Sequence, residues 1–206
     1  MINDKRILIE KLKEDPWFIY KNHDDISSNL FDDKEIALLA VSMNEFSLEY
    51  FSERLKDNDD VVMEAILLND SACKYASSRL KNDRCFLLKA FDYKITKGIN
   101  NGVMLSYVSE ELKDDYDIVY KAVKGYGLQI EDASERLRDD DVLCFLAVDN
   151  FPPAFEFISH RLRDDKTILL AALRKVDKED AKEILSYASE RLKQDETIIR
   201  LIEEKH

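Results

Sequence analysis

The chain has 206 residues, and its 31 Lys or Arg against 43 Asp or Glu give a net charge of −12 at pH 7. The 45% hydrophobic content argues against a disordered acidic tail and for a folded protein. Because nucleic-acid binding needs concentrated Lys and Arg, and here these residues are dispersed, we expect no direct nucleic-acid partner.

Residues 1–5 lack the basic and apolar segments of a signal peptide, and no apolar run approaches about 18 residues. The three cysteines Cys73, Cys85 and Cys144 lack metal-ligand spacing and are typical of reduced thiols. We therefore expect a cytoplasmic protein that does not engage a membrane.

An internal repeat organises the chain. The string Tyr75 to Asp83 recurs at Tyr187 to Asp195, and its serine anchors a series of related copies. The anchors are Ser27, Ser52, Ser77, Ser109, Ser134, Ser159 and Ser189, at intervals of 25, 25, 32, 25, 25 and 30 residues. A degenerate copy with Ile9 at the anchor position precedes them.

The intervals divide the chain into consecutive elements within a single repeat domain, 1–206. In chain order these are an irregular N-terminal cap at 1–25, repeats at about 26–43, 44–68 and 69–93, an insertion at 94–100, repeats at about 101–125, 126–150 and 151–175, an insertion at 176–180, and a repeat at 181–206. The first insertion carries two lysines and no acid, so we expect a solvated basic loop there.

Two apolar stripes with helical spacing mark each repeat. Positions −4, −1 and +3 from the anchor form helix A, and positions +9, +10, +13 and +14 form helix B, with alanine at +13 in six copies. A lone pair of helices cannot bury such stripes, whereas stacking does. The sequence therefore predicts an all-α fold, an α-solenoid of about eight stacked helix-turn-helix repeats of about 25 residues.

The sixth residue after each anchor is Asp or Asn, the class preferred at helix N-caps. These residues are Asp15, Asp33, Asn58, Asp83, Asp115, Asp140, Asp165 and Asp195. A calcium loop at 57–60 is the alternative, but it lacks the required Gly and Glu positions. We predict structural N-caps and no metal site.

An arginine follows the anchor by two positions in five copies: Arg54, Arg79, Arg136, Arg161 and Arg191. Acids follow at +5 and +6, so the favoured interpretation is an Arg–Asp ladder that links adjacent repeats. The alternative, an anion-binding stripe, would be neutralised by those acids.

Residues that could carry chemistry are sparse. His23, His160 and His206 lack zinc or nucleophile spacing, Cys73 and Cys144 occupy apolar positions, and the 125–127 segment has no phosphate-loop pattern. Aromatic residues at −2, such as Tyr50 and Tyr75, either pack between repeats or line a partner groove. We expect no catalytic residue and no cofactor.

The pattern [FY]-[AVFI]-S-x-x-L-[KR]-x-[DN], followed by an A-[VI] helix, resembles the repeats of domain of unknown function family 4116. This uncharacterised family occurs in bacterial proteins and in large DNA viruses of protists. The resemblance runs from about Asp24 to the end, with its best copies at 44–68, 69–93, 126–150 and 181–205, and departures at Asn29, Glu111 and Asp132. It implies a helical protein and no established activity.

The favoured function is a non-enzymatic scaffold for protein–protein interaction that binds a basic protein surface. The alternative is an inhibitor or immunity protein that neutralises a basic toxin or nuclease by charge complementarity. An enzyme would need a site assembled across several repeats. The identity of the partner, the binding face and the oligomeric state stay open.

Overall fold

The computed structural model describes residues 1–99 and 102–205. The chain forms two compact units, Met1–Lys94 with Tyr107–Ser109, and Ile95–Ser106 with Glu110–His206. The predicted single domain 1–206 therefore stays a prediction. Residues 100, 101 and 206, at the ends of the predicted insertion 94–100 and the predicted repeats 101–125 and 181–206, lie outside the described residues.

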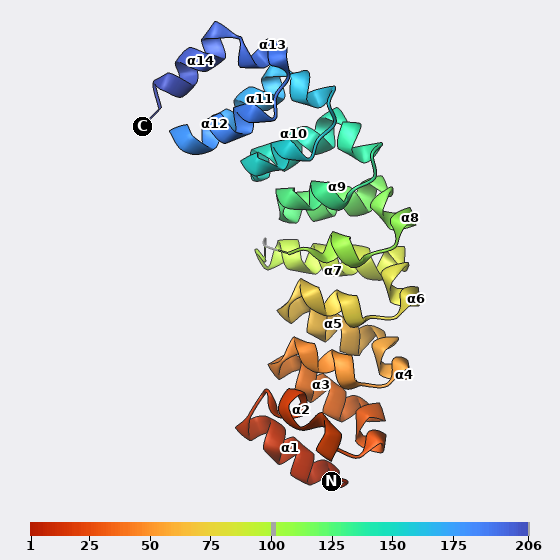
Figure 1. The fold of residues 1–206 in the computed structure, drawn as a ribbon. Helices are drawn as coiled ribbons and strands as arrows, with labels where there is room; N and C mark the ends of the chain where they lie inside the picture. Colours follow the sequence, from red (N-terminus) through yellow and green to blue (C-terminus); the bar gives the residue numbers. More distant parts are fainter. Residues whose placement is uncertain (100–101, 206) are drawn as a thin grey trace. The chain divides into compact units, whose positions relative to one another are not determined.

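Unit 1 is a stack of short helices. In Figure 1 its longer helices lie side by side in chain order, with α4 and α6 at one edge. Its elements are α1 (Lys5–Glu14), α2 (Phe18–Asn22), the 3₁₀ helices η1 (His23–Asp25) and η2 (Ser28–Asp32), α3 (Lys34–Met43), η3 (Glu45–Tyr50), α4 (Glu53–Lys56), α5 (Asp59–Leu68), η4 (Asp70–Tyr75), α6 (Ser78–Lys81) and α7 (Arg84–Thr96), whose last two residues fall in unit 2.

Unit 2 repeats the arrangement. Its helices α9, α10 and α11 pack against one another in sequence. Its elements are η5 (Met104–Tyr107, whose last residue falls in unit 1), α8 (Glu110–Lys113), α9 (Tyr116–Gly125), η6 (Gly127–Asp132), η7 (Leu137–Asp139), α10 (Asp141–Asn150), η8 (Pro152–Glu156), η9 (Leu162–Asp164), α11 (Lys166–Leu173), α12 (Lys178–Ser186), α13 (Glu190–Lys193) and α14 (Glu196–Glu203). The predicted all-α repeat fold is confirmed.

The helix B stripe forms the core of each unit. In α5, the residues at +9, +10, +13 and +14 are Val61, Val62, Ala65 and Ile66, all fully buried. The same four positions are buried in α3, α7, α9, α10 and α11. Burying each large apolar side chain contributes about 2 kcal/mol, and the small alanine at +13 lets neighbouring helices approach.

The prediction for helix A is wrong in detail, because the segment breaks at the anchor. In the second repeat, 3₁₀ helix η3 ends at Tyr50, Phe51 and Ser52 are extended with ψ of 159° and 156°, and α4 then begins at Glu53. The Ser52 N–H donates to the carbonyl oxygen of Phe31 in the preceding repeat at 2.9 Å. That N–H is therefore unavailable for a helical hydrogen bond, and one continuous helix cannot form.

The two insertions lengthen helices. The first is predicted to form a solvated basic loop, but its residues 94–96 continue α7, and Lys94 is buried and pairs with Asp70. Residues 97 and 98 form an exposed turn. The second places Asp177 as the N-cap of the nine-residue helix α12, where other repeats have a shorter 3₁₀ helix. Burial of an ion pair explains why a lysine-bearing segment stays helical here.

The N-terminal segment lies against the first anchor. Within the described residues the only β pairing is a parallel bridge between Ile2 and Ile26, and the Ser27 N–H donates to the Ile2 carbonyl oxygen at 2.8 Å. At later anchors the serine N–H bonds to a carbonyl oxygen of the preceding repeat, and here Ile2 provides that acceptor. Helix α1 packs on α3 beside it.

Candidate functional site

The anchor serine and the arginine two positions later lie at the junction between consecutive repeats. Ser159 donates from its N–H to the Arg138 carbonyl oxygen at 2.8 Å and from its hydroxyl to the Asp139 carboxylate. Arg161 donates from Nε to that carboxylate at 2.9 Å and from Nη2 to the Asp139 carbonyl oxygen at 2.5 Å. Ser159 Oγ also accepts from the Leu162 N–H at 3.2 Å. The serine thus ties two repeats together and caps the following turn.

The same contacts recur at four other junctions. Distances from arginine Nε to carboxylate Oδ1 span 2.8 to 3.1 Å, and those from Nη2 to the carbonyl oxygen span 2.5 to 2.7 Å. The pairs are Arg54–Asp32, Arg79–Asp57, Arg136–Asp114 and Arg191–Asp164. Each arginine in the predicted ladder therefore bonds to the preceding repeat.

The junction carboxylates stay about half exposed but are held in their charged form. The serine hydroxyl, followed by the arginine, lowers the pKa of Asp32, of Asp114 and of Asp164. The same two donors lower the pKa of Asp57 and of Asp139 against a desolvation that opposes them. Because each arginine charge is matched by a carboxylate, these residues form structural links and not an open anion-binding stripe.

The sequence indicated acids near the arginines but did not identify the partner. The partner is the fifth residue after the preceding anchor. The sequence does contain a sign of this pairing, because the two positions change together. Where the fifth residue is Asn82 instead of Asp, the following repeat carries Glu111 in place of arginine. Ser109 still donates from its hydroxyl to Asn82 Oδ1 at 2.6 Å.

Seven of the predicted cap residues accept main-chain N–H groups of the following helix. The distances are 2.7 to 3.3 Å, and the residues are Asp33, Asn58, Asp83, Asp115, Asp140, Asp165 and Asp195. Each side chain satisfies N–H groups that the helix itself leaves unpaired.

The predicted cap at Asp15 needs correction. Its carboxylate accepts from the Trp17 N–H at 2.9 Å and from Lys21 Nζ at 2.8 Å, but Trp17 occupies the N-cap position of α2. Residues 16 and 17 form a turn, and the Phe18 N–H bonds to the Asp15 carbonyl oxygen, so the helix begins at Phe18.

The side chains of the acidic tract at 57–60 bond to protein groups. Asp57 and Asp59 bond to Arg79, Asn58 caps α5, and Asp60 accepts from Lys34 at 2.5 Å. Over residues 1–99 and 102–205, no group of three His, Cys, Asp or Glu side chains is arranged to hold a metal ion. In the same part of the chain, no helix has both the length and the apolar character to cross a membrane.

The cysteines and histidines lie apart from one another. Burial raises the pKa of Cys73 and that of Cys144 to about 12, so both thiols stay protonated, and Cys85 is exposed. His160 is exposed beside Arg163, and His23 stacks on the Tyr50 ring at 4.5 Å. His206 lies outside the described residues.

Polar contacts, one partly buried and one buried, form a second set of links between repeats. Asn69 Nδ2 donates to Glu45 Oε1 at 2.9 Å. At the equivalent positions one repeat later, Lys94 donates to Asp70, and the two side chains are 7% and 4% exposed. Burial lowers the pKa of Lys94. The sequence missed this pair because Lys94 falls in an insertion.

Exposed apolar side chains gather on consecutive helix B elements of unit 2. Tyr116 and Tyr120 of α9 stack at 6.3 Å, and Val142 and Phe145 of α10 are 61% and 43% exposed. Because α9 packs on α10, and α10 on α11, these side chains form one region, which we call the α9–α11 surface. These apolar residues lie on helix B elements but outside the buried stripe. Apolar residues at such positions indicate an exposed apolar surface, and the sequence analysis did not consider them.

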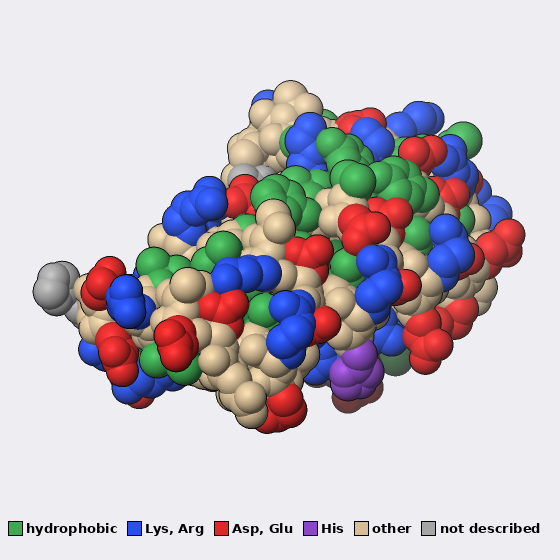
Figure 2. Space-filling model, turned by 90° about the horizontal axis from the view of Figure 1, so that it is seen from above, with side chains coloured by type: hydrophobic (Ala, Val, Ile, Leu, Met, Phe, Trp, Pro, Cys, Tyr) green, Lys and Arg blue, Asp and Glu red, His purple; other side chains and the backbone are tan. Residues whose placement is uncertain are grey.

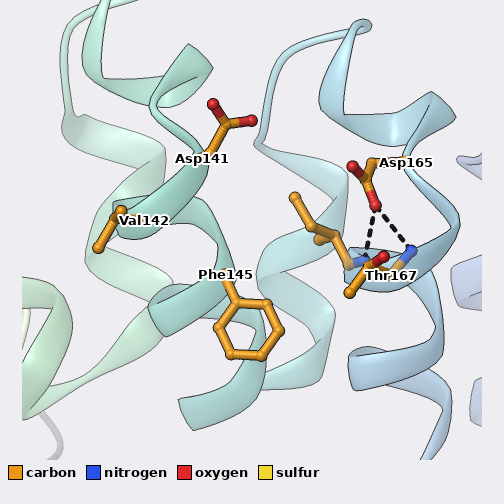
Figure 3. Close-up of a pocket in the computed structure, with 6 residues that line it drawn as sticks. Asp141, Val142, Phe145, Asp165 and Thr167 are labelled. Atoms are coloured by element: carbon orange, nitrogen blue, oxygen red, sulfur yellow. Dashed lines mark hydrogen bonds between the residues drawn. The ribbon is translucent and has the colours of Figure 1, made fainter.

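A groove of about 390 Å³ lies on this surface between α10 and α11. Figure 3 shows Val142 and Phe145 projecting from α10 and Thr167 from α11, with the Asp165 carboxylate turned to the main chain. Asp141 borders the groove and accepts from Arg161 Nη1 at 3.0 Å. The groove therefore offers an apolar floor with carboxylates on its rim.

Charges of both signs are interspersed elsewhere. Figure 2 shows Lys or Arg and Asp or Glu side chains alternating over the face in view, with apolar side chains between them. The arrangement offers no broad basic face in that view, in keeping with the chain's net charge of −12.

Comparison with known proteins places the repeats in a family. The family described as Domain of unknown function (DUF4116) matches residues 33–77, 60–94, 99–138 and 143–177. Searches of curated proteins and of solved structures found no match. The family matches cover more than half of the chain, fall within the part that carries the repeats, and leave the last repeat, 181–206, unmatched. The chain therefore belongs to the DUF4116 family.

Proposed function

We propose that this protein is a non-enzymatic interaction scaffold whose α9–α11 surface binds a basic partner protein. The observation that carries the proposal is the exposure of Tyr116, Tyr120, Val142 and Phe145 on adjacent helices. Contiguous exposed apolar side chains with a polar rim are typical of protein interaction sites. Aromatic residues supply much of the energy at such sites.

The charge of the chain favours a basic partner. The net charge is −12 and the pI is about 4.8. Carboxylates border the apolar region: Asp141, which also bonds to Arg161, and Asp165, which caps α11, line the groove, and Asp140 and Asp117 contribute to the raised pKa of Tyr116 after desolvation. The net negative charge of the chain would steer a basic surface toward it.

The side chains also favour binding over catalysis. The two buried thiols have raised pKa values, which is the opposite of what a cysteine nucleophile needs. Most aspartates of the repeats either cap a helix or bond to a junction arginine, so their oxygens serve the fold. These structural uses of the thiols and carboxylates support a role in binding, which depends on surface shape and charge.

The test is affinity capture from the source cells with wild-type protein and with the Val142→Ser/Phe145→Ser variant. Both side chains are exposed, so the variant should keep the wild-type circular dichroism. We expect a specific basic protein that the variant fails to retain and whose binding to wild type weakens as salt rises.

Leu68→Ser is the matched control, because Leu68 is an exposed apolar residue on α5 of unit 1. It should retain the partner as wild type does. Equal capture by wild type and by the Val142→Ser/Phe145→Ser variant, or binding that salt does not weaken, would contradict the proposal.

A partner that proves to be a basic toxin or nuclease would make the protein an inhibitor or immunity protein. The same surface and charge would serve that function. An assay of the partner's activity with and without this chain separates a scaffold, which leaves the activity unchanged, from an inhibitor, which abolishes it.

A further inference from the structure

An aromatic cluster lies on unit 1 and shares no residue with the α9–α11 surface. It consists of Trp17, the N-cap residue of α2, Tyr20 from α2, Phe46 and Tyr50 from η3, and Tyr75 from η4. We call it the Trp17 face. These short segments are brought together because α2 packs on η3 and η3 packs on η4.

Tyr20 stands at a steep angle to both Trp17 and Tyr50. Trp17 and Tyr20 lie 5.9 Å apart at 86°, and Tyr20 and Tyr50 lie 6.4 Å apart at 79°. Phe46 stacks on Trp17 at 6.4 Å. Trp17 and Tyr20 are the most open rings, with 46% and 52% of each residue exposed. Nearly perpendicular open rings form two walls of a cage of the kind that surrounds organic cations.

The chain's own basic groups already occupy neighbouring rings of this face. The Lys74 ammonium lies 4.5 Å from the Tyr75 ring centroid and 5.6 Å from that of Phe46. The His23 imidazole stacks on Tyr50 at 4.5 Å. Two rings of this face therefore already accept a lysine ammonium, and Trp17 and Tyr20 are the most exposed pair of the same cluster.

Carboxylates flank the rings and add to their attraction for cations. Glu49 accepts from the Tyr75 hydroxyl at 2.9 Å and, after desolvation, helps to raise the pKa of Tyr50. Asp24 contributes to the same shift. An exposed cation–π contact strengthens where a nearby carboxylate offsets the desolvation of the cation.

We propose that the Trp17 face binds a lysine or arginine side chain of a partner peptide, with Trp17 and Tyr20 as the walls that hold the cation. Methylated lysine fits the same geometry, because the contact uses ring faces and needs no N–H donor. The inference rests on the proposed function in one respect only, that the partner is basic, and it adds a specific contact to general charge attraction.

The experiment measures binding of a short fluorescein-labelled lysine homopeptide by anisotropy at low salt. The trimethyl-lysine version of the peptide should bind at least as tightly, and the acetyl-lysine version, which lacks the charge, should not bind. Trp17 is the sole tryptophan of the chain, so its fluorescence should shift on binding of either charged peptide.

Trp17→Leu keeps an apolar side chain and the net charge but removes the ring. It should weaken binding about five-fold, the effect expected for one exposed cation–π contact, and Trp17→Phe should recover part of the loss. Tyr20→Leu should act in the same direction. Tyr93→Leu, at an exposed position of α7, is the control and should bind as wild type does.

Two failures are distinguishable. Equal binding by wild type and Trp17→Leu, with both weakened by salt, would show that net charge alone holds the peptide and would overturn the cage while leaving the proposed function intact. No binding of any charged peptide to wild type at low salt would contradict both the cage and the basic partner.

Discussion

The guanidinium of Arg136 donates to both the carboxylate and the main-chain carbonyl of Asp114, at 3.0 and 2.6 Å, across 22 residues of sequence. The same carboxylate accepts the hydroxyl of Ser134, whose N–H bonds to Lys113 of the same preceding repeat. An arginine fixed by two acceptors on one residue holds a defined geometry, which a single exposed ion pair does not. The junction is therefore the element that sets the register of one repeat on the next.

Arg161→Ala should lower the thermal stability of the protein, and Arg161→Lys should recover only part of the loss. Lysine can replace the ion pair with Asp139 but cannot donate to the carboxylate and the carbonyl with fixed geometry. The midpoint of thermal unfolding by circular dichroism measures both. Arg200→Ala, at an exposed position of α14, is the control and should leave the midpoint unchanged.

Acid should destabilise the protein through the junction carboxylates. Serine and arginine donors lower the pKa of Asp139 in the folded state, so the unfolded chain binds more protons in acid. The stabilisation is therefore complete above the unfolded aspartate pKa of about 3.9 and is lost as the pH falls through the lower folded value. Denaturant unfolding followed over pH should show a steep decline below about pH 4.

Asp139→Asn should make the loss of stability in acid less steep, because one titrating group is removed. The same variant should be less stable than wild type near neutral pH. Glu64→Gln changes the charge equally at an exposed position on α5 and should keep the slope of wild type. A slope that Asp139→Asn leaves unaltered would mean that other groups govern the acid response.

Much of the core was predictable because it repeats. The positions +9, +10, +13 and +14 are apolar in copy after copy, and the structure buries them in six successive helices. The leucine at +3, such as Leu80, is buried as the pattern indicates. Periodicity of this kind depends on local geometry alone, which a sequence records directly.

Contacts between repeats were less predictable, because they depend on partners more than 20 residues away. The break in helix A follows from the bond of Ser52 to Phe31, which no local pattern reveals. The burial of Lys94 depends on Asp70, a residue 24 positions earlier in a different helix. The Trp17 ring contacts Phe46 and the Tyr20 ring contacts Tyr50 only after the first repeats have packed.

The buried pair Lys94–Asp70 should respond strongly to single replacements. Lys94→Met or Asp70→Leu alone leaves one uncompensated buried charge and should lower the free energy of unfolding by about 3–5 kcal/mol. The double variant removes both charges and should lie within about 2 kcal/mol of wild type. A double-mutant cycle by urea unfolding measures the coupling. Additive effects of the two replacements would contradict a direct buried pair.

Two glycines near the end of α9 should respond to alanine in opposite directions. The Gly127 N–H donates to Asn150 Oδ1 at 3.1 Å, and a Cβ there would collide with the Ala147 carbonyl oxygen of α10. Gly127→Ala should therefore lower the free energy of unfolding by about 1–3 kcal/mol. At Gly125, inside the helix, the nearest atom to an added Cβ is Ile95 Cγ1 at 4.0 Å.

Gly125→Ala should thus leave stability unchanged or raise it by up to about 1 kcal/mol, because alanine favours the helix and restricts the unfolded chain. Urea unfolding of both variants tests the close approach of η6 to α10. Equal stability of Gly127→Ala and Gly125→Ala would mean that the backbone of α10 does not lie against Gly127. The packing of η6 on α10 would then be looser than the hydrogen bond from Gly127 to Asn150 requires.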